Sequence, residues 1–200
     1  MTSEMKAHWE KVYQTKSPHE VSWTQAVPQT SLELILACEP ALDASIIDIG
    51  GGDSLLVDHL LKQGFSKLTV LDISAKAIER AQTRLGDDAQ KVHWIVSNIL
   101  DFQPSTSYDL WHDRAAFHFL TTQPEINSYK RLVKENVLAH LCMGTFSKDG
   151  PSRCSGLDIS QYDGDSLSFD GFEKLNCFQE KHTTPFDTEQ DFLFCRFRKN

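Results

Sequence analysis

The sequence predicts an α/β fold built on one doubly wound, mostly parallel sheet of seven strands. Apolar runs typical of buried strands alternate with helical segments from Ser45 onward. Such alternation is typical of a parallel sheet with right-handed crossovers and helices on both faces. The chain has 200 residues, of which 40% are hydrophobic, and this suits one globular domain with a sizeable core. We expect a single domain over residues 1–200, with an N-terminal helical cap at 1–44 and the core at 45–200.

The stretch from residue 45 to residue 54 organises the core. Ser45–Ile49 is a short apolar run with one carboxylate, Asp48, and three glycines at positions 50–52 follow it directly. Glycine has no Cβ and tolerates positive φ, so a ligand can lie against such a turn. We expect Asp53 or Ser54 to cap the next helix, whose free N–H groups face the sheet edge where α/β folds bind ligands. A tight turn without a ligand is the alternative.

The second strand, Leu68–Asp72, predicts which ligand the turn binds. It ends in Asp72, which follows Gly50 by 22 residues. An acid about 20 residues after such a turn hydrogen-bonds ribose hydroxyls in nucleotide-binding folds. A dinucleotide site would have a further glycine where Leu55 stands, to let the pyrophosphate approach. The sequence therefore predicts an adenosine ligand without a pyrophosphate.

The other elements follow from apolar periodicity and turn residues. Gly64 and Gly86 end two helices, Thr183–Asp187 predicts a hairpin, and one short helix is expected within Ser147–Asp170. The strands are expected at Ser45–Ile49, Leu68–Asp72, Val92–Ser97, Tyr108–Asp113, Val137–Phe146, Leu175–His182 and Gln190–Arg198. The helices are expected near His8–Tyr13, Ser31–Cys38 with Thr30 or Ser31 as its cap, Ser54–Gln63, Ser74–Leu85 and Pro124–Glu135.

The composition argues against several classes of protein. No apolar run reaches the roughly 18 residues of a membrane helix, and the polar start of the chain has no signal core. The net charge of −8 disfavours a nucleic-acid backbone as partner. The five cysteines form no C-x-x-C pair and the eight histidines show no ligand spacing, so we expect reduced thiols and no metal. These features predict a cytoplasmic monomer or homodimer that binds neither membrane nor nucleic acid.

Four segments together resemble the class I S-adenosylmethionine-dependent methyltransferases, and the resemblance extends over most of the chain: Asp48–Gly52, Leu71–Ser74, Ser97–Leu100 and Tyr108–Leu110. It implies a Rossmann-like sheet closed by an antiparallel hairpin, S-adenosylmethionine as cofactor and S-adenosylhomocysteine as product. It also implies that the glycine turn holds the methionine part, the acid after the second strand the ribose, and the residues after the third strand the adenine. The implied cofactor-binding residues are Asp48, Gly50, Gly51, Gly52, Asp72, Ile73, Asn98, Ile99 and Asp113.

One position departs from the family pattern. The family often has Asp where this chain has Asn98. An amide oxygen can still accept a hydrogen bond from the adenine amino group, so we retain Asn98 as a cofactor residue.

Aromatic residues near the N-terminus are candidates for covering the site. Trp9 and Tyr13 lie on one side of the first helix, and Trp23 follows the break at Ser17-Pro18. Aromatic rings beside a cationic sulfonium contribute about 0.5–2 kcal/mol of cation–π stabilisation. Related methyltransferases use such a segment to close the cofactor site. Plain core packing of these rings is the alternative.

The residues after the fourth strand are candidates for chemistry, since the methyl group is expected at that edge. His112 and His118 are candidate bases, because histidine can take a proton from an attacking amine, thiol or hydroxyl. Asp113 is the third catalytic candidate, and Arg114 is assigned to the substrate pocket or lid. An Asp113–Arg114 ion pair that rigidifies the loop is the alternative. Methyl transfer needs little covalent help from the protein, because the methyl group arrives activated.

The methyl acceptor is left open. Enzymes that methylate base amino groups often carry Pro-Pro and an aromatic residue after the fourth strand, whereas Asp113–Ala116 stands there in this chain. Gly144–Pro151 and Cys154–Leu157 resemble an uncharacterised subgroup that is distantly similar to thiopurine-type and protein-lysine methyltransferases. We expect a small-molecule acceptor, with a protein lysine or a non-catalytic cofactor-binding module as alternatives. Cys154 has only Arg153 as a basic neighbour, so we expect little thiolate.

Overall fold

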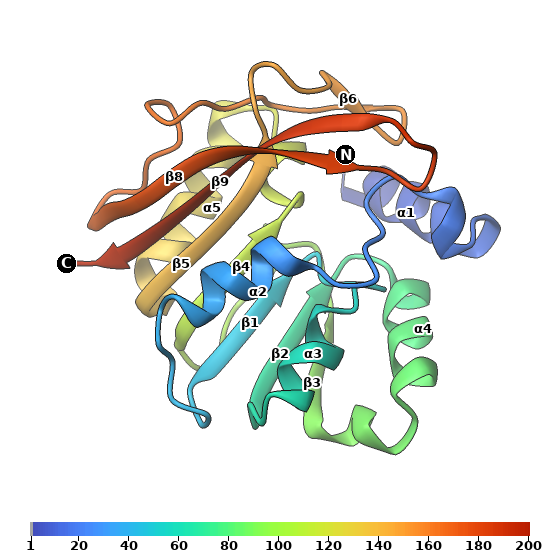
Figure 1. Cartoon of the computed structure of the whole chain (residues 1–200), viewed down its shortest axis with the longest axis horizontal. Helices are drawn as coiled ribbons and strands as arrows, with labels where there is room; N and C mark the ends of the chain where they lie inside the picture. The colour runs from blue at the N-terminus through green and yellow to red at the C-terminus, as the bar shows by residue number, and fades with distance from the viewer. Residues whose placement is uncertain (1) are drawn as a thin grey trace.

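A seven-stranded sheet runs through the structure, a computed structural model that describes residues 2–200 (Figure 1). The strands lie in the order β3-β2-β1-β4-β5-β9-β8. Strands β1 to β5 pair in parallel, whereas β9 runs antiparallel to both β5 and β8. The strands are β1 Ser45–Ile49, β2 Lys67–Asp72, β3 Val92–Val96, β4 Tyr108–Arg114, β5 Val137–Phe146, β8 Phe172–Thr183 and β9 Glu189–Lys199. The predicted sheet of seven strands with an antiparallel close is therefore confirmed.

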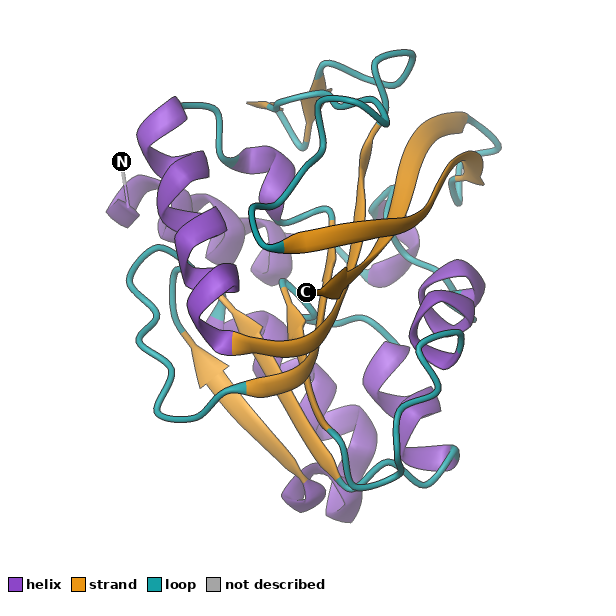
Figure 2. Cartoon of the chain, turned by 90° about the vertical axis from the view of Figure 1, so that its left-hand side faces the viewer, coloured by secondary structure: helices purple, strands orange, loops and turns teal. Residues whose placement is uncertain are grey.

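Helices cover both faces of this sheet (Figure 2). Alternate residues of each strand point to opposite faces, so Ile46 packs on one side with α2, α3 and α4, and Ile47 on the other with α5. The helices are α1 Thr2–Thr15, α2 Gln29–Leu36, α3 Leu56–Lys62, α4 Ala75–Leu85 and α5 Gln123–Asn136, with short 3₁₀ turns η1 Pro18–Glu20, η2 Gly86–Lys91 and η3 Phe117–Phe119. Within the described residues, no helix combines the length and the apolar character needed to cross a bilayer.

The order of the strands places the glycine turn at the centre of one sheet edge. β1 is hydrogen-bonded to β2 on one side and to β4 on the other. The carboxyl ends of these three parallel strands therefore meet at the edge where open α/β sheets bind ligands. α4 is capped by Ser74, whose side chain accepts from the N–H of Ala77, and it ends at Gly86 with φ of 58°, as predicted.

Two local predictions are wrong: the short helix expected within residues 147–170, and the N-cap expected for the helix after the glycine turn. The segment 147–170 contains no helix among its described residues and instead forms a two-strand hairpin, β6 Arg153–Cys154 and β7 Leu157–Asp158. Its turn needs positive φ at Ser155 and Gly156, which ends any helical path. α3 begins only after Leu55, so neither predicted residue occupies its N-cap, although Ser54 Oγ accepts from Leu56 N.

The predicted cap of α2 is also wrong. The helix begins at Gln29 after Pro28, so Thr30 and Ser31 lie inside its first turn. Their hydroxyls instead make tertiary hydrogen bonds, Thr30 to Glu180 and Ser31 to His112.

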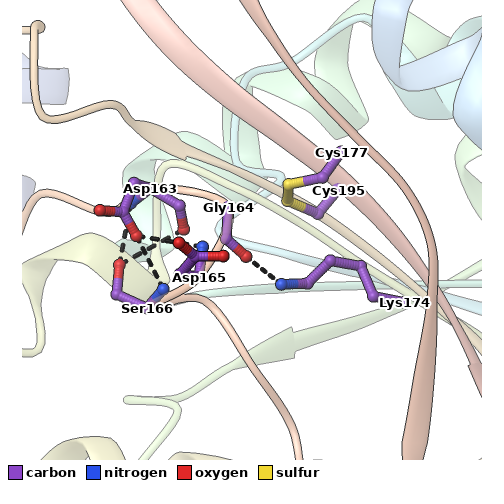
Figure 3. The surroundings of a disulfide bond; sticks show 7 residues. All are labelled: Asp163, Gly164, Asp165, Ser166, Lys174, Cys177 and Cys195. Carbon is purple, nitrogen blue, oxygen red and sulfur yellow. Dashed lines mark hydrogen bonds between the residues drawn. A yellow bond between two sulfur atoms is a disulfide. The ribbon is translucent and has the colours of Figure 1, made fainter.

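The prediction of reduced thiols is wrong for one pair of cysteines. Cys177 on β8 and Cys195 on β9 stand opposite each other and form a disulfide (Figure 3). Beside it, the ammonium of Lys174 donates to the carbonyl of Gly164 and ties the 163–166 turn to β8 (Figure 3). The pairing depends on the register of two antiparallel strands, which cysteine spacing does not reveal. Cys38, Cys142 and Cys154 are free and buried.

Candidate cofactor and acceptor site

A cavity of about 1280 Å³ opens at the carboxyl ends of β1, β2 and β4. Its walls include the glycine turn, the ends of β2, β3 and β4, and the segment before β1. A single small-molecule pocket usually measures roughly 300–1,000 Å³. The cavity therefore has room for two small ligands side by side.

The glycine turn forms the part of the wall next to β1. Gly50 and Gly52 have positive φ of 68° and 37°, a region that residues with a Cβ rarely adopt. A Cβ on Gly51 would stand 2.4 Å from Asp48 Oδ2, and one on Gly52 would stand 2.5 Å from Asp72 Oδ2. The turn is thus packed directly against two carboxylates. Glycine is required here both for the backbone path and for this close packing.

Asp72 has the environment expected of a ribose-binding acid. It ends β2, lines the cavity and is only 5% exposed. Its Oδ1 accepts from the N–H of Ser74 at 2.8 Å. Burial, together with the nearby charges of Asp48 and Glu10, raises the pKa of this carboxyl to about 7. Hydroxyl donors from a ligand would stabilise the ionised form, so a ribose fits this position.

The segment after β3 provides an apolar wall with one amide. Asn98, Ile99 and Leu100 all line the cavity. Asn98 Oδ1 accepts from the N–H of Leu100 at 2.9 Å, so part of its acceptor capacity is used within the turn. An amide oxygen has two lone pairs, and one remains for a ligand. Ile73 and Ile99 contribute flat apolar surface on which an adenine ring can pack.

Three buried side chains form a chain of hydrogen bonds beside the glycine turn. His112 Nδ1 lies 2.6 Å from Asp48 Oδ1, and His112 Nε2 lies 2.9 Å from Ser31 Oγ. All three residues line the cavity. An ionised Asp48 accepts the Nδ1 proton, so Nε2 is left to accept the Ser31 hydroxyl proton. Sequence reasoning missed Ser31, because it is 81 residues from His112 and only the packing of α2 on β4 joins them.

Asp113 holds the loop that follows β4. Its Oδ2 accepts from Tyr129 Oη at 2.6 Å, and its Oδ1 accepts from the N–H groups of Ala116 and Phe117, each at 3.0 Å. Burial raises its pKa to about 6. Asp113 is not among the described residues that line the cavity, and no ion pair joins it to Arg114 within the described chain. The loop after β4 is therefore ordered by hydrogen bonds from backbone N–H groups to Asp113, rather than by an Asp113–Arg114 ion pair.

His118 lies away from the cavity wall. Its ring is fully buried and stacks on Phe146 with centroids 4.8 Å apart. Burial, with the charge of Arg114, lowers the pKa of His118 to about 3, so the ring is neutral at physiological pH. Cys154 lines the cavity, but burial raises the pKa of its thiol to about 11, which leaves little thiolate near neutral pH.

The N-terminal aromatic residues cover the cavity. Trp9, Tyr13 and Trp23 all line it, with ring centroids 5.6 Å apart for Trp9 and Trp23 and 6.2 Å for Tyr13 and Trp23. Trp9 also meets Phe119 from the loop after β4 at 5.2 Å. Two segments far apart in sequence thus share one aromatic wall. We call Trp9, Tyr13, Trp23 and Phe119 the aromatic wall.

Glu10 attaches this wall to the core, and sequence reasoning missed it. Its Oε1 accepts from the N–H of Ala75 at 2.7 Å, and its Oε2 accepts from the N–H of Lys76 at 3.1 Å and from Ser74 Oγ at 3.0 Å. A carboxylate on α1 therefore caps the N-terminus of α4, where the helix dipole favours negative charge. These bonds lower the pKa of Glu10 although burial opposes them. A cap supplied by a different helix leaves no local motif in the sequence.

Comparisons with known proteins agree with this geometry. The family model described as "Methyltransferase domain" matches residues 47–147. The chain is 31% identical over 80 residues to malonyl-[acyl-carrier protein] O-methyltransferase 1 of Ilyobacter polytropus, covering 40% of this chain and 30% of that protein. It is 31% identical over 94 residues to EEF1A lysine methyltransferase 2 of Mus musculus, covering 45% and 38%. The matched part thus spans about a third of the length of these curated relatives.

Solved structures share the fold over almost the whole chain. A structure titled for the conversion of a disulfide bond into a thioacetal group during echinomycin biosynthesis has a TM-score of 0.76 at 17% identity, covering 98% of this chain and 93% of that one. A SAM-dependent methyltransferase from Anabaena variabilis has a TM-score of 0.75 at 13% identity, covering 100% and 95%. The N-methyltransferase NodS from Bradyrhizobium japonicum, in complex with S-adenosylhomocysteine, has a TM-score of 0.66 at 16% identity, covering 99% and 96%.

Proposed function

The chain belongs to the methyltransferase-domain family, and we propose that it is an S-adenosylmethionine-dependent methyltransferase whose methyl acceptor is a small molecule. The observation that carries this proposal is the walled cavity of about 1280 Å³, in which the aromatic wall adjoins the glycine turn: Tyr13 Oη lies 3.2 Å from where a Cβ on Gly52 would stand. A solved structure with the same fold, at a TM-score of 0.69 and 14% identity, is the 1,6-didemethyltoxoflavin N1-methyltransferase of Burkholderia thailandensis, with 1,6-didemethyltoxoflavin and S-adenosylhomocysteine bound. A cavity with room for two small ligands suits a cofactor and a small acceptor together.

Protein lysine is the second candidate acceptor, because one relative is an EEF1A lysine methyltransferase. A lysine ammonium needs acidic or neutral side chains along its path to the methyl group. Here the guanidinium of Arg114 lines the cavity beside the aromatic wall, and like charges disfavour a second cation there. This charge favours a neutral or anionic small molecule.

The cofactor is assigned to the residues whose geometry fits it. We infer that Gly50 and Gly51 hold the methionine part, that Asp72 holds the ribose, and that Ile73 with the residues after β3 holds the adenine. When bound, S-adenosylmethionine supplies a methyl group already activated on a sulfonium. The protein's contribution is therefore to orient the acceptor, exclude water and accept a proton where one must leave.

His112 is the residue that we propose as proton acceptor. Asp48 fixes its Nδ1 as the protonated nitrogen, and Nε2 accepts from Ser31 Oγ, which lines the cavity. An acceptor hydroxyl or amine can pass its proton to Ser31 as Ser31 passes its own to Nε2, and Asp48 then stabilises the imidazolium. We assign positioning roles to Asp113 and His118, which hold the loop after β4 from outside the cavity.

Transfer of a labelled methyl group tests the proposal. The protein is incubated with methyl-labelled S-adenosylmethionine and a cell extract that has been separated into a low-molecular-mass filtrate and a protein fraction. We expect label in the filtrate fraction. Label that enters only the protein fraction would favour the lysine alternative, and tight S-adenosylhomocysteine binding without any transfer would favour a binding module.

A further inference from the structure

Arg114 is a buried cation whose donors are largely unused. It ends β4 and lines the cavity. Its only hydrogen bond among the described residues runs from Nη1 to the carbonyl oxygen of Trp23 at 3.1 Å. Nε and Nη2 are buried and have no hydrogen-bond partner in the described part of the chain. A guanidinium carries five N–H donors, so most of its capacity is open.

The acids near Arg114 are committed to other groups. Asp48 and Glu180 are close enough to favour its charged form, yet neither forms an ion pair with it in the described chain. Asp48 accepts from His112 at 2.6 Å, and Glu180 accepts from Thr30 at 2.6 Å. Burial lowers the pKa of Arg114 to about 10, so the side chain still carries its charge at neutral pH. A buried charge without a partner is costly, and this cost falls when an anion binds.

The sheet makes room for this side chain. Arg114 packs over the ring of Phe192 on β9, with its Cζ 5.2 Å from the ring centroid. On β5 the residue beside it is Gly144, where a Cβ would lie 3.3 Å from Arg114 Cγ and 2.7 Å from Phe194 Cε1. A larger residue at position 144 would force these side chains to shift. The guanidinium is therefore seated in a defined place at the cavity wall.

That place lies on the β5 side of β4, away from the glycine turn and Asp72. Arg114 faces β5 and β9, whereas the glycine turn and Asp72 lie at the ends of β1 and β2, on the other side of β4. Trp23, whose carbonyl it contacts, belongs to the aromatic wall. A ligand at this position therefore meets a planar cation and aromatic rings together.

We propose that Arg114 binds a carboxylate of the methyl acceptor, which makes the acceptors of this enzyme small aromatic carboxylic acids. This inference rests on the proposed function. A planar carboxylate matches the guanidinium fork, and the aromatic wall contacts the rest of the acceptor. The cofactor also carries a carboxylate, in its methionine part, so the experiment must separate the two sources of this group.

Calorimetry with a matched pair of probes tests the proposal. 2-Naphthoate and its neutral analogue 2-naphthamide are titrated into protein saturated with S-adenosylhomocysteine. We expect the wild type to bind naphthoate about tenfold more tightly than naphthamide or better. Arg114→Gln should bind both probes equally, and Arg114→Lys should retain part of the preference. Arg84→Gln is the matched control, because Arg84 is another cation at the cavity wall but pairs with Asp53 and Asp58.

Cofactor titrations distinguish the sources of the carboxylate. S-adenosylhomocysteine and 5′-methylthioadenosine, which lacks the amino-acid part, should each bind Arg114→Gln within about twofold of the wild type. If Arg114→Gln loses affinity for S-adenosylhomocysteine but not for 5′-methylthioadenosine, Arg114 binds the cofactor and the proposal is overturned. Equal binding of both naphthyl probes by the wild type would also overturn it. Failure of the wild type to bind S-adenosylhomocysteine would instead overturn the proposed function. If Arg114→Gln does not fold, the preference for naphthoate over naphthamide is compared between the wild type and Arg114→Lys instead.

Discussion

At the scale of single residues, the strongest test concerns the proton on Asp72. Its pKa in the folded protein is about 7, raised from 3.8 mainly by burial. Between about pH 4 and pH 7 the folded protein therefore holds a proton that the unfolded chain has lost, so this residue's contribution to stability falls as pH rises through that window. Ribose hydroxyls donate to the ionised form, so ligand affinity depends on pH in the opposite direction.

We expect affinity for S-adenosylhomocysteine to rise between about pH 5.5 and pH 7.5 and then to level off. Asp72→Asn keeps the shape of the side chain but removes its charge, so it should bind more weakly, by roughly 1.5–3 kcal/mol, and lose this pH dependence. Calorimetric titration of both proteins across this range provides the measurement. An unchanged pH slope in the variant would show that another group is responsible.

His112 provides a second test at this scale. His112→Gln can still donate to Asp48 but cannot take a proton, so kcat should fall by about 10²–10⁴-fold. The dissociation constant for S-adenosylhomocysteine should stay within about twofold, because the cofactor residues are untouched. The acceptor found in the labelling experiment serves as substrate, with Ser31→Ala as the companion variant. Full activity in His112→Gln would refute the role of His112 as base.

Some residues that line the cavity could be predicted from the sequence and others could not. The glycine turn and Asp72 are readable because each follows a strand directly, and parallel strands bring their carboxyl ends to one edge. Ser31, by contrast, reaches His112 only through the packing of a helix on the sheet. No local motif signals such a contact.

At the scale of elements, Glu10 tests how α1 is held over the site. Glu10→Gln removes the negative charge at the N-terminus of α4, a change worth about 0.3–1 kcal/mol, and weakens three hydrogen bonds. We expect faster proteolysis within α1 and weaker binding of S-adenosylhomocysteine, with little change in melting temperature. Gln14→Ala, at an exposed position on the same helix, is the control. Equal proteolysis of both variants and the wild type would contradict the role of Glu10.

The β8–β9 pair carries a second prediction at this scale. With Cys177 and Cys195 joined, three cysteines are free. Thiol titration of the denatured, unreduced protein should therefore find three thiols, and five only after reduction. Five thiols before reduction would show that the bond does not form in solution. The bond was not predictable from spacing, because it depends on the register of the hairpin.

At the scale of the whole molecule, the fold was largely predictable and the aromatic cover of the cavity was not. Apolar runs, the glycine turn and the final hairpin locate the strands of the observed sheet to within a few residues. The segment 147–170 was not predictable, because its hairpin is held by tertiary contacts such as that of Ser160 with the His118 carbonyl. The aromatic wall joins residues 9 and 119, and only the folded arrangement reveals that they meet.

The central claim is that this edge of the sheet binds S-adenosylmethionine, and one calorimetric experiment tests it most directly. S-adenosylhomocysteine and NAD are titrated separately into the wild-type protein. We predict binding of S-adenosylhomocysteine at one site per chain and no heat with NAD, because Leu55 stands where a dinucleotide site has its further glycine. Tighter binding of NAD than of S-adenosylhomocysteine would contradict the account.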